Sequence, residues 1–366
     1  MTVTESELMD RLAEVEDPQV GDDIVSMNLV NDVEIDGEDA TLSLAFNTPY
    51  SPAEMELGDR IREAVTELGL EPSLRAQVDA DHGFDVEVLP SVRNVIAVAS
   101  GKGGVGQTTV AANLAAGLND LGARVGLLDA DIHGPNVPTI LPPDGEPGVT
   151  PDGEMVPARS GGVMVMSMGQ LTRESDDPAI LRGPMVNNVM MKFFNDVEWG
   201  RLDYLIIDLP PGTGDASLNL LQSIPVTGTV IVTTPQEMAV ADARKGLRMF
   251  EEHDAPILGL VENMSSFHCP SCGDEHDPFG RGGAEEITED YGVSLLGTLP
   301  IHPDFGTEDR DAPVIRDEES DIRAIVQGLV EDIADRIGEM NRQRVADNAP
   351  TLPEDEVPTG PDDRSE

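Results

Sequence analysis

The sequence predicts an α/β fold: a mostly parallel sheet covered by helices on both faces, preceded by a small N-terminal α+β domain. Two observations lead to this fold class. From residue 92 onward, short apolar strand-like runs alternate with helix-like segments, an alternation typical of a parallel sheet. A glycine-rich turn at residues 101–106 joins the first of these strands to the first helix, which is the setting that a phosphate-binding loop requires.

The small domain is expected to occupy residues 1–90. Its predicted elements are helices at 5–15 and 53–68 and strands at 24–35, 40–46 and 73–78. Asp36-Gly37 separates the first two strands and is a typical hairpin turn. The boundary is placed near Pro90, just before the apolar strand that leads into the glycine-rich turn.

The larger domain is expected at residues 91–342, as a phosphate-loop (P-loop) nucleoside triphosphatase fold. Its strands are predicted at 95–100, 124–129, 163–168, 204–209, 229–233, 257–262 and 295–299. Its helices are predicted at 108–120, 185–194, 216–223, 238–252, 284–291 and 320–340. Residues 343–366 are rich in proline and acidic residues, so we expect a disordered acidic tail there.

Composition excludes several classes of protein. The chain has 70 acidic and 23 basic residues and a net charge of −47, which predicts a strongly solvated surface of the kind found in halophilic, high-salt cytoplasm. No basic stripe is available for nucleic acid. The N-terminus does not have the pattern of a signal peptide, and no apolar run is long enough for a membrane span. We therefore expect a soluble, cytoplasmic protein with no membrane partner, and its two cysteines exclude a disulfide framework.

The glycine-rich turn departs from the usual phosphate-loop pattern at one position. G-x-x-x-x-G-K-[ST] expects lysine at position 107, where this chain has Gln107. Glutamine can donate neutral hydrogen bonds to phosphate but brings no charge. The next residue, Thr108, is placed to bind Mg²⁺ through its hydroxyl. The expected nucleotide-binding residues here are Gly101, Lys102, Gly103, Gly104, Val105, Gly106, Gln107, Thr108 and Thr109.

Acidic residues end two of the later strands. Asp129 and Asp131 follow one strand, and Asp208 ends the apolar strand before Pro210. Such residues often only cap turns. Beside bound phosphates they could instead orient a water molecule or hold Mg²⁺. The turn around Thr213 that follows is suited to sensing a γ-phosphate.

Cys269 and Cys272 are the only cysteines, two residues apart in a polar turn. A redox pair is one interpretation. Two thiolates do not fill a tetrahedral metal site, but two copies of the chain would supply four sulfurs for Zn²⁺ or for an iron–sulfur cluster. The neighbouring His268 and His276 could ligate zinc, although the simpler interpretation is that they are surface histidines.

Taken together, these motifs resemble the Mrp/NBP35 (ApbC-like) family of iron–sulfur cluster carrier ATPases, within the deviant phosphate-loop group that includes MinD and ParA. The matching stretches are residues 101–109, 129–136, 182–185, 203–214, 230–236, 262–265, 269–272 and 279–284. The small domain is similar to the MIP18-type (DUF59) domain, through Asp17-Pro18 and residues 48–52.

The resemblance implies a role for each residue of the nucleotide site. Lys102 would reach the phosphates bound by a partner subunit, and Asp131 would orient the attacking water. Asp208 would be the Walker B carboxylate beside Mg²⁺, and Asn263 would hydrogen-bond the adenine of ATP. The implied activity is ATP hydrolysis, which the neutral Gln107 is expected to make slow or absent because a phosphate-stabilising charge is missing.

The resemblance also implies a cargo and partners. Cys269 and Cys272 would share a [4Fe-4S] cluster across a homodimer, and the cluster would be passed to apoprotein clients. The MIP18-type loop normally has cysteine at the position of Ser51, so no cluster is expected in the small domain. The alternative is a non-hydrolysing, zinc-clamped dimeric scaffold that binds nucleotide. A MinD-like or ParA-like partitioning ATPase ranks below both, because the acidic C-terminus offers no basic helix.

Overall fold

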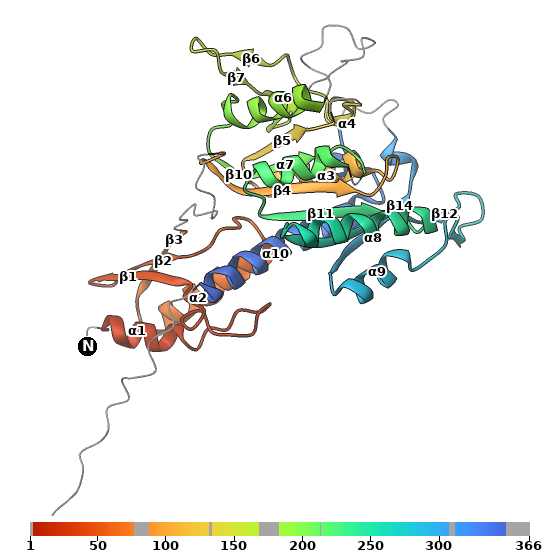
Figure 1. Ribbon diagram of the computed structural model, residues 1–366. Helices are drawn as coiled ribbons and strands as arrows, with labels where there is room; N and C mark the ends of the chain where they lie inside the picture. Colours follow the sequence, from red (N-terminus) through yellow and green to blue (C-terminus); the bar gives the residue numbers. More distant parts are fainter. Residues whose placement is uncertain are drawn as a thin grey trace, which may run out of the picture.

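The fold class predicted from the sequence is confirmed by the computed structural model (Figure 1). The residues it describes are 3–76, 88–131, 134–167, 183–212, 214–306 and 312–348. Its main sheet comprises β4 (Val92–Ser100), β5 (Val125–Asp129), β8 (Ala158–Ser160), β9 (Val163–Ser167), β10 (Leu202–Asp208), β11 (Gly228–Thr233), β12 (Ile257–His268), β13 (Glu275–His276) and β14 (Leu295–Ile301). A separate two-stranded ribbon comprises β6 (Gly148–Val149) and β7 (Met155–Val156).

The main sheet has nine strands in the order β13-β12-β11-β4-β10-β5-β9-β8, with β14 also paired to β12. Among the described strands of the main sheet, only the short strands β8 and β13 run antiparallel to the strand with which they pair. The central strands β5, β10 and β11 are buried along their whole length. Strands that are covered on both faces need continuous apolar runs, and such runs in the sequence are what predicted these strands.

Helices cover both faces of this sheet. They are α3 (Gln107–Asp120), α4 (Val137–Ile140), α6 (Gly183–Asn195), α7 (Asp215–Ser223), α8 (Glu237–Glu252), α9 (Gly283–Tyr291) and α10 (Arg323–Asp347), with the short turns η1 (Pro303–Phe305) and η2 (Val314–Arg316). One hydrophobic cluster joins α3 and α10 to one face, and a second joins α6, α7, α8 and α9 to the other. No described helix is both long and apolar enough to cross a membrane.

The small domain is the predicted α+β unit. It contains α1 (Glu5–Leu12), β1 (Val30–Asp36), β2 (Asp39–Leu44), α2 (Pro52–Glu67) and β3 (Glu71–Ala76). The strands β1 and β2 form the expected antiparallel hairpin, and β3 pairs parallel to β2. The first strand begins six residues later than expected, because residues 24–29 form turns instead.

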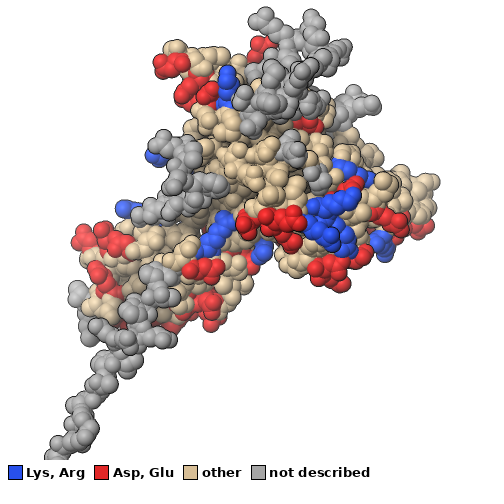
Figure 2. Space-filling model, viewed as in Figure 1, with Lys and Arg blue, Asp and Glu red and all other residues tan. Residues whose placement is uncertain are grey.

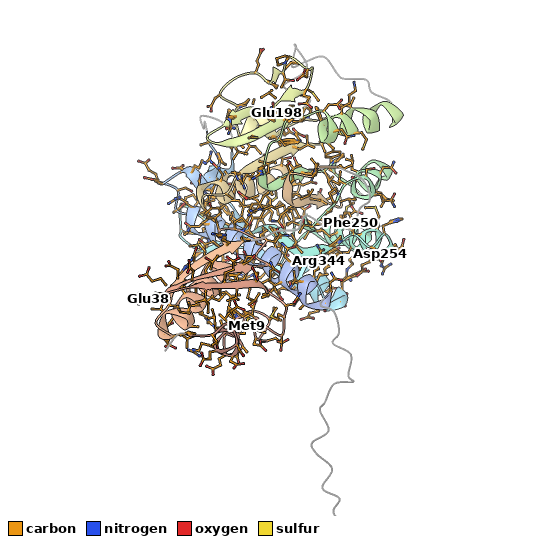
Figure 3. All side chains as sticks on the ribbon, turned by 90° about the vertical axis from the view of Figure 1, so that its left-hand side faces the viewer. Met9, Glu38, Glu198, Phe250, Asp254 and Arg344 are labelled. Carbon is orange, nitrogen blue, oxygen red and sulfur yellow. The ribbon has the colours of Figure 1, made fainter. Side chains whose placement is uncertain are left out.

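Helix α10 connects the two domains. It runs to Asp347, so the first five residues of the expected disordered tail are helical; residues 349–366 lie outside the described part. Val345 and Ala346 pack against the hydrophobic cluster of the small domain. Arg344, on the same turn, donates to the carbonyl of Thr227 at 2.9 Å in the large domain. Figure 3 shows Arg344 between the small domain, marked by Met9 and Glu38, and the end of α8, marked by Phe250 and Asp254.

Candidate functional site

The glycine-rich loop lies at the carboxyl end of β4 and leads into α3. Gly104 and Gly106 have φ of +80° and +85°, a conformation that favours glycine. A Cβ on Gly101 would lie 2.4 Å from the backbone of Asp242 in α8, and one on Gly106 would lie 2.1 Å from Asn263 Nδ2. The close contacts account for Gly101 and Gly106, and the positive φ accounts for Gly104. The loop backbone can therefore curl at the helix N-terminus, where N–H groups favour phosphate.

Gln107 is buried beneath this loop. Its Nε2 donates to the carbonyls of Val98 at 3.0 Å and Leu209 at 2.5 Å, and to Asp208 Oδ1 at 2.9 Å. Its Oε1 accepts from Ser100 Oγ at 2.5 Å. The amide thus ties the end of β4 to the end of β10. All its polar atoms are used within the protein, and none of these bonds requires a charge.

Two buried aspartates stand side by side at the same edge. Asp208 and Asp129 are paired in register on β10 and β5. Burial raises the pKa of Asp208 to about 7, although hydrogen bonds from Thr108 and Gln107 oppose the rise. Burial and the neighbouring Asp208 carboxylate raise the pKa of Asp129 to about 8, against a hydrogen bond from Ser167. The pair therefore favours a protonated form near neutral pH, and a divalent cation would favour the ionised form.

Thr108 and Asp131 complete the acidic edge. The Thr108 hydroxyl hydrogen-bonds the Asp208 carboxylate, so the two oxygens that would hold Mg²⁺ lie together. The Asp131 N–H donates to Asp129 Oδ1 at 3.1 Å, and Asp131 Oδ1 accepts from the N–H of Gly134 at 3.2 Å. This donor set of hydroxyl and carboxylate oxygens fits Mg²⁺. The expected γ-phosphate sensor Thr213 lies outside the described residues.

Two further predicted residues are Lys102, which belongs to the loop, and Asn263, which lies against it. Lys102 Nζ donates to Gln236 Oε1, at the start of α8, at 3.3 Å. Asn263 is buried; its Nδ2 donates to the carbonyl of Val105 at 2.9 Å, and its Oδ1 accepts from the N–H of Met264 at 2.9 Å. Asn263 therefore supports the loop, and its expected contact with adenine stays a prediction.

A small cavity of about 10 Å³, with room for about one water molecule, opens beside the loop. Its lining residues are Thr109, Asn113, Thr139, Ile140, Asp304, Phe305, Gly306, Ala312, Pro313 and Val314. The sequence patterns indicated only Thr109 among these residues. The others come from α3, α4 and the segment after β14, and no short motif connects them, so the fold alone brings them together.

The two thiols lie far from the small domain. Cys269 and Cys272 are free and follow β12 in a hairpin that projects at one end of the molecule, while the small domain is at the other end (Figure 1). Ser51 is fully buried, and its Oγ caps α2 by accepting from the N–H of Glu54 at 3.1 Å. The position that carries cysteine in MIP18-type loops is thus part of the domain interface. His276, expected to be a simple surface histidine, lies beside the thiols.

Comparison with known proteins agrees with this geometry. Residues 91–335 match the family described as NUBPL iron-transfer P-loop NTPase, and residues 5–78 match the family described as iron-sulfur cluster assembly protein. A Synechocystis protein named iron-sulfur cluster carrier protein is 43% identical over 300 residues, covering 79% of this chain and 85% of that protein. A protein of the same name from Escherichia coli is 46% identical over 249 residues, covering 67% of each.

One solved structure is similar in both sequence and fold. A nucleotide-binding protein in complex with ADP from Archaeoglobus fulgidus is 39% identical, with a TM-score of 0.53, covering 60% of this chain and 86% of that one. The resemblance inferred from the sequence is thereby confirmed for both domains. The chain belongs to the NUBPL iron-transfer P-loop NTPase family and carries an N-terminal domain of the iron-sulfur cluster assembly type.

Proposed function

We propose that this protein is a homodimeric carrier that binds ATP–Mg²⁺ and passes [4Fe-4S] clusters to apoproteins. The names of its relatives point to cluster carriage. The observation that carries the proposal is the pair of free thiols on the projecting β12–β13 hairpin. Two thiolates per chain do not complete the four ligands of a cluster, and a second chain would supply the other two. A cluster held this way lies near solvent, from which an apoprotein can take it.

The nucleotide would bind at the carboxyl edge of the main sheet. The loop backbone would bind the phosphates, and Thr108 and Asp208 would hold Mg²⁺, with Asp131 beside them to orient water. Lys102 would reach the phosphates of the partner subunit. Hydrolysis is expected to be slow, because Gln107 is neutral and bonded within the protein.

Anaerobic reconstitution with iron and sulfide tests the cluster. The wild type should become a brown dimer with about two iron atoms per chain, as a shared four-iron cluster requires. Cys269→Ala and Cys272→Ala should lose the iron and the visible absorption. Ser271→Ala, in the same turn, is the matched control and should retain both. Iron binding by Cys269→Ala at the wild-type level would refute the proposal.

The second candidate is the zinc-clamped, non-hydrolysing scaffold. It is favoured by the neutral Gln107, which brings no charge to the phosphates. Metal analysis of anaerobically purified protein separates the two functions. Iron with sulfide supports the carrier, whereas about half a zinc ion per chain without iron supports a zinc clamp between four thiolates.

A further inference from the structure

The hairpin brings a third ligand to the two cysteines. Strand β12 ends at His268, the chain turns through Cys269 and Cys272, and β13 returns so that His276 pairs with Phe267. His276 Nε2 lies 3.9 Å from Cys272 Sγ. The three ligand atoms of Cys269, Cys272 and His276 all lie within 4.8 Å of one another, and all three come from one chain.

The turn is already ordered around the first thiol. The N–H of Cys269 donates to the carbonyl of Asp274 at 3.0 Å, and the N–H of Gly273 donates to the carbonyl of Cys269 at 2.9 Å. Gly273 has a φ of +76°, which allows this tight turn. The backbone N–H groups of Cys272 and Ser271 hydrogen-bond to the Cys269 sulfur, so the turn holds this sulfur in place.

The spacing suits a single metal ion. With Zn–S of about 2.3 Å and Zn–N of about 2.0–2.1 Å, a tetrahedral ion separates sulfur from nitrogen by about 3.6 Å. The observed 3.9 Å between Cys272 and His276 needs only a small contraction. Two thiolates and one imidazole form a known zinc ligand set, in which the fourth position stays open. The site is exposed, so water can occupy that position.

We propose that each single chain binds one divalent transition-metal ion, of the Zn²⁺ type, through Cys269 Sγ, Cys272 Sγ and His276 Nε2. This mononuclear site differs from a four-thiolate clamp because it needs no second chain. This site rests on the proposed function only because the single ion and the iron–sulfur cluster would use the same two thiols. The two therefore cannot be bound at the same time. His276 is a ligand of the single ion and not of the cluster.

Cobalt titration of the reduced, metal-free full-length protein tests the site, because tetrahedral Co²⁺ with thiolate ligands absorbs in the visible range. The wild type should bind one Co²⁺ per chain without changing its sedimentation. His276→Ala should bind Co²⁺ at least about ten-fold more weakly, with an altered spectrum, as expected for loss of a metal-site partner. His268→Ala is the matched control. This exposed histidine adjoins Cys269 but is not among the three proposed ligands, so its variant should bind Co²⁺ like the wild type.

Two results would overturn the inference: half a Co²⁺ per chain accompanied by dimer formation, or an unchanged affinity and spectrum in His276→Ala. Cluster reconstitution of the same variants separates this inference from the proposed function. If His276→Ala accepts the cluster but not cobalt, both ideas hold. If wild type binds cobalt but no cluster, the carrier function fails and the mononuclear site remains. Cys272→Ser should lose both, which confirms that the thiols are shared.

Discussion

At the scale of single residues, Gln107 decides how the nucleotide site can work. Its amide nitrogen faces three acceptors: the carbonyls of Val98 and Leu209 and the carboxylate of Asp208. An amide has only two N–H donors, so one of them is shared. An ammonium has three donors and a charge. A lysine ammonium at this position would face the same three acceptors. Within the described part of the chain, the side chains that hydrogen-bond Asp208 are Gln107 and Thr108, and both are neutral.

Gln107→Lys is expected to increase ATP turnover. The added charge would stabilise the phosphates in the transition state, and removal of one such group in other enzymes costs about 10²–10³-fold in kcat. It would also lower the pKa of Asp208, because an adjacent cation favours the carboxylate. Steady-state phosphate release with saturating ATP and Mg²⁺, measured from pH 5 to pH 9, checks both effects.

Gln107→Leu is the control for this prediction. Leucine removes the hydrogen bonds of the amide without adding charge, so this variant should lose stability and gain no activity. Equal kcat values for wild type and Gln107→Lys would contradict the prediction. They would show that Lys102 or an arginine already supplies the positive charge.

At the scale of elements, α10 fixes the small domain to the large one through a buried arginine. Arg342 is fully buried; its Nε donates to Asp17 Oδ2 at 2.5 Å and its Nη2 to Gln19 Oε1 at 2.5 Å. Glu54 lies 3.5 Å from the same guanidinium. The adjacent Asn341 donates to Thr48 Oγ1 at 3.0 Å. One cation thus faces two carboxylates of the small domain.

Arg342→Met should destabilise the protein by about 3–5 kcal/mol, because it leaves buried carboxylates without their cation. Arg60→Met removes an exposed pair with Glu56 and an exposed hydrogen bond to the carbonyl of Glu16 at 3.4 Å, and should cost less than about 1 kcal/mol. Urea unfolding followed by circular dichroism measures both. A loss below about 1 kcal/mol for Arg342→Met would show that the domain interface does not depend on this pair.

Glu54 makes the same interface sensitive to pH. Burial raises the pKa of Glu54 from 4.5 to about 7, although Arg342 opposes the rise. A raised carboxyl pKa stabilises the folded state fully below pH 4.5, and this contribution is lost as pH rises through about 7. Glu54→Gln should therefore flatten the decline in unfolding free energy between pH 5 and 8. If the unfolding free energy of the wild type changes with pH between 5 and 8 as that of Glu54→Gln does, Glu54 is not the group responsible for the pH dependence.

The parts of the structure that the sequence predicted follow strong local patterns. The buried strands β5, β10 and β11 and the helices α3, α6, α7, α8 and α9 were expected within a few residues, because apolar runs and glycine turns mark them. The short helix α4 was missed, and α10 continues seven residues beyond its expected end at residue 340. The short strand β13 was missed, since two residues carry no periodicity. The contacts of Arg342 with Asp17 and of Tyr204 with Pro49 were also missed, because the paired residues are far apart in the chain and no local pattern relates them.

At the scale of the whole molecule, three working parts lie apart: the thiol hairpin and the glycine-rich loop belong to the main sheet, and the small domain has a sheet of its own. The thiol hairpin and the small domain are at opposite ends in Figure 1, and the loop for nucleotide lies on the main sheet between β4 and α3. Strand β12 connects two of these parts directly, because Asn263 supports the loop and His268 borders Cys269.

The surface charge sets the conditions under which this molecule is stable. Figure 2 shows acidic side chains in several separate patches on the visible face, with a basic group near α8. Some of that basic charge is neutralised locally, because Arg244 pairs with Glu286 and Lys245 with Asp242. The net charge of −47 therefore acts mainly as self-repulsion, which opposes the compact state.

Thermal stability should rise with salt. The screening length falls from about 10 Å at 0.1 M to about 3 Å at 1 M, so added KCl should weaken the repulsion most over that range. We expect the Tm to increase steeply from about 0.01 M to about 1 M KCl and then more slowly. Sucrose at equal osmolality is the control, because it strengthens burial without screening charge. A Tm that is constant in KCl, or that rises equally in sucrose, would show that self-repulsion does not limit the stability of this fold.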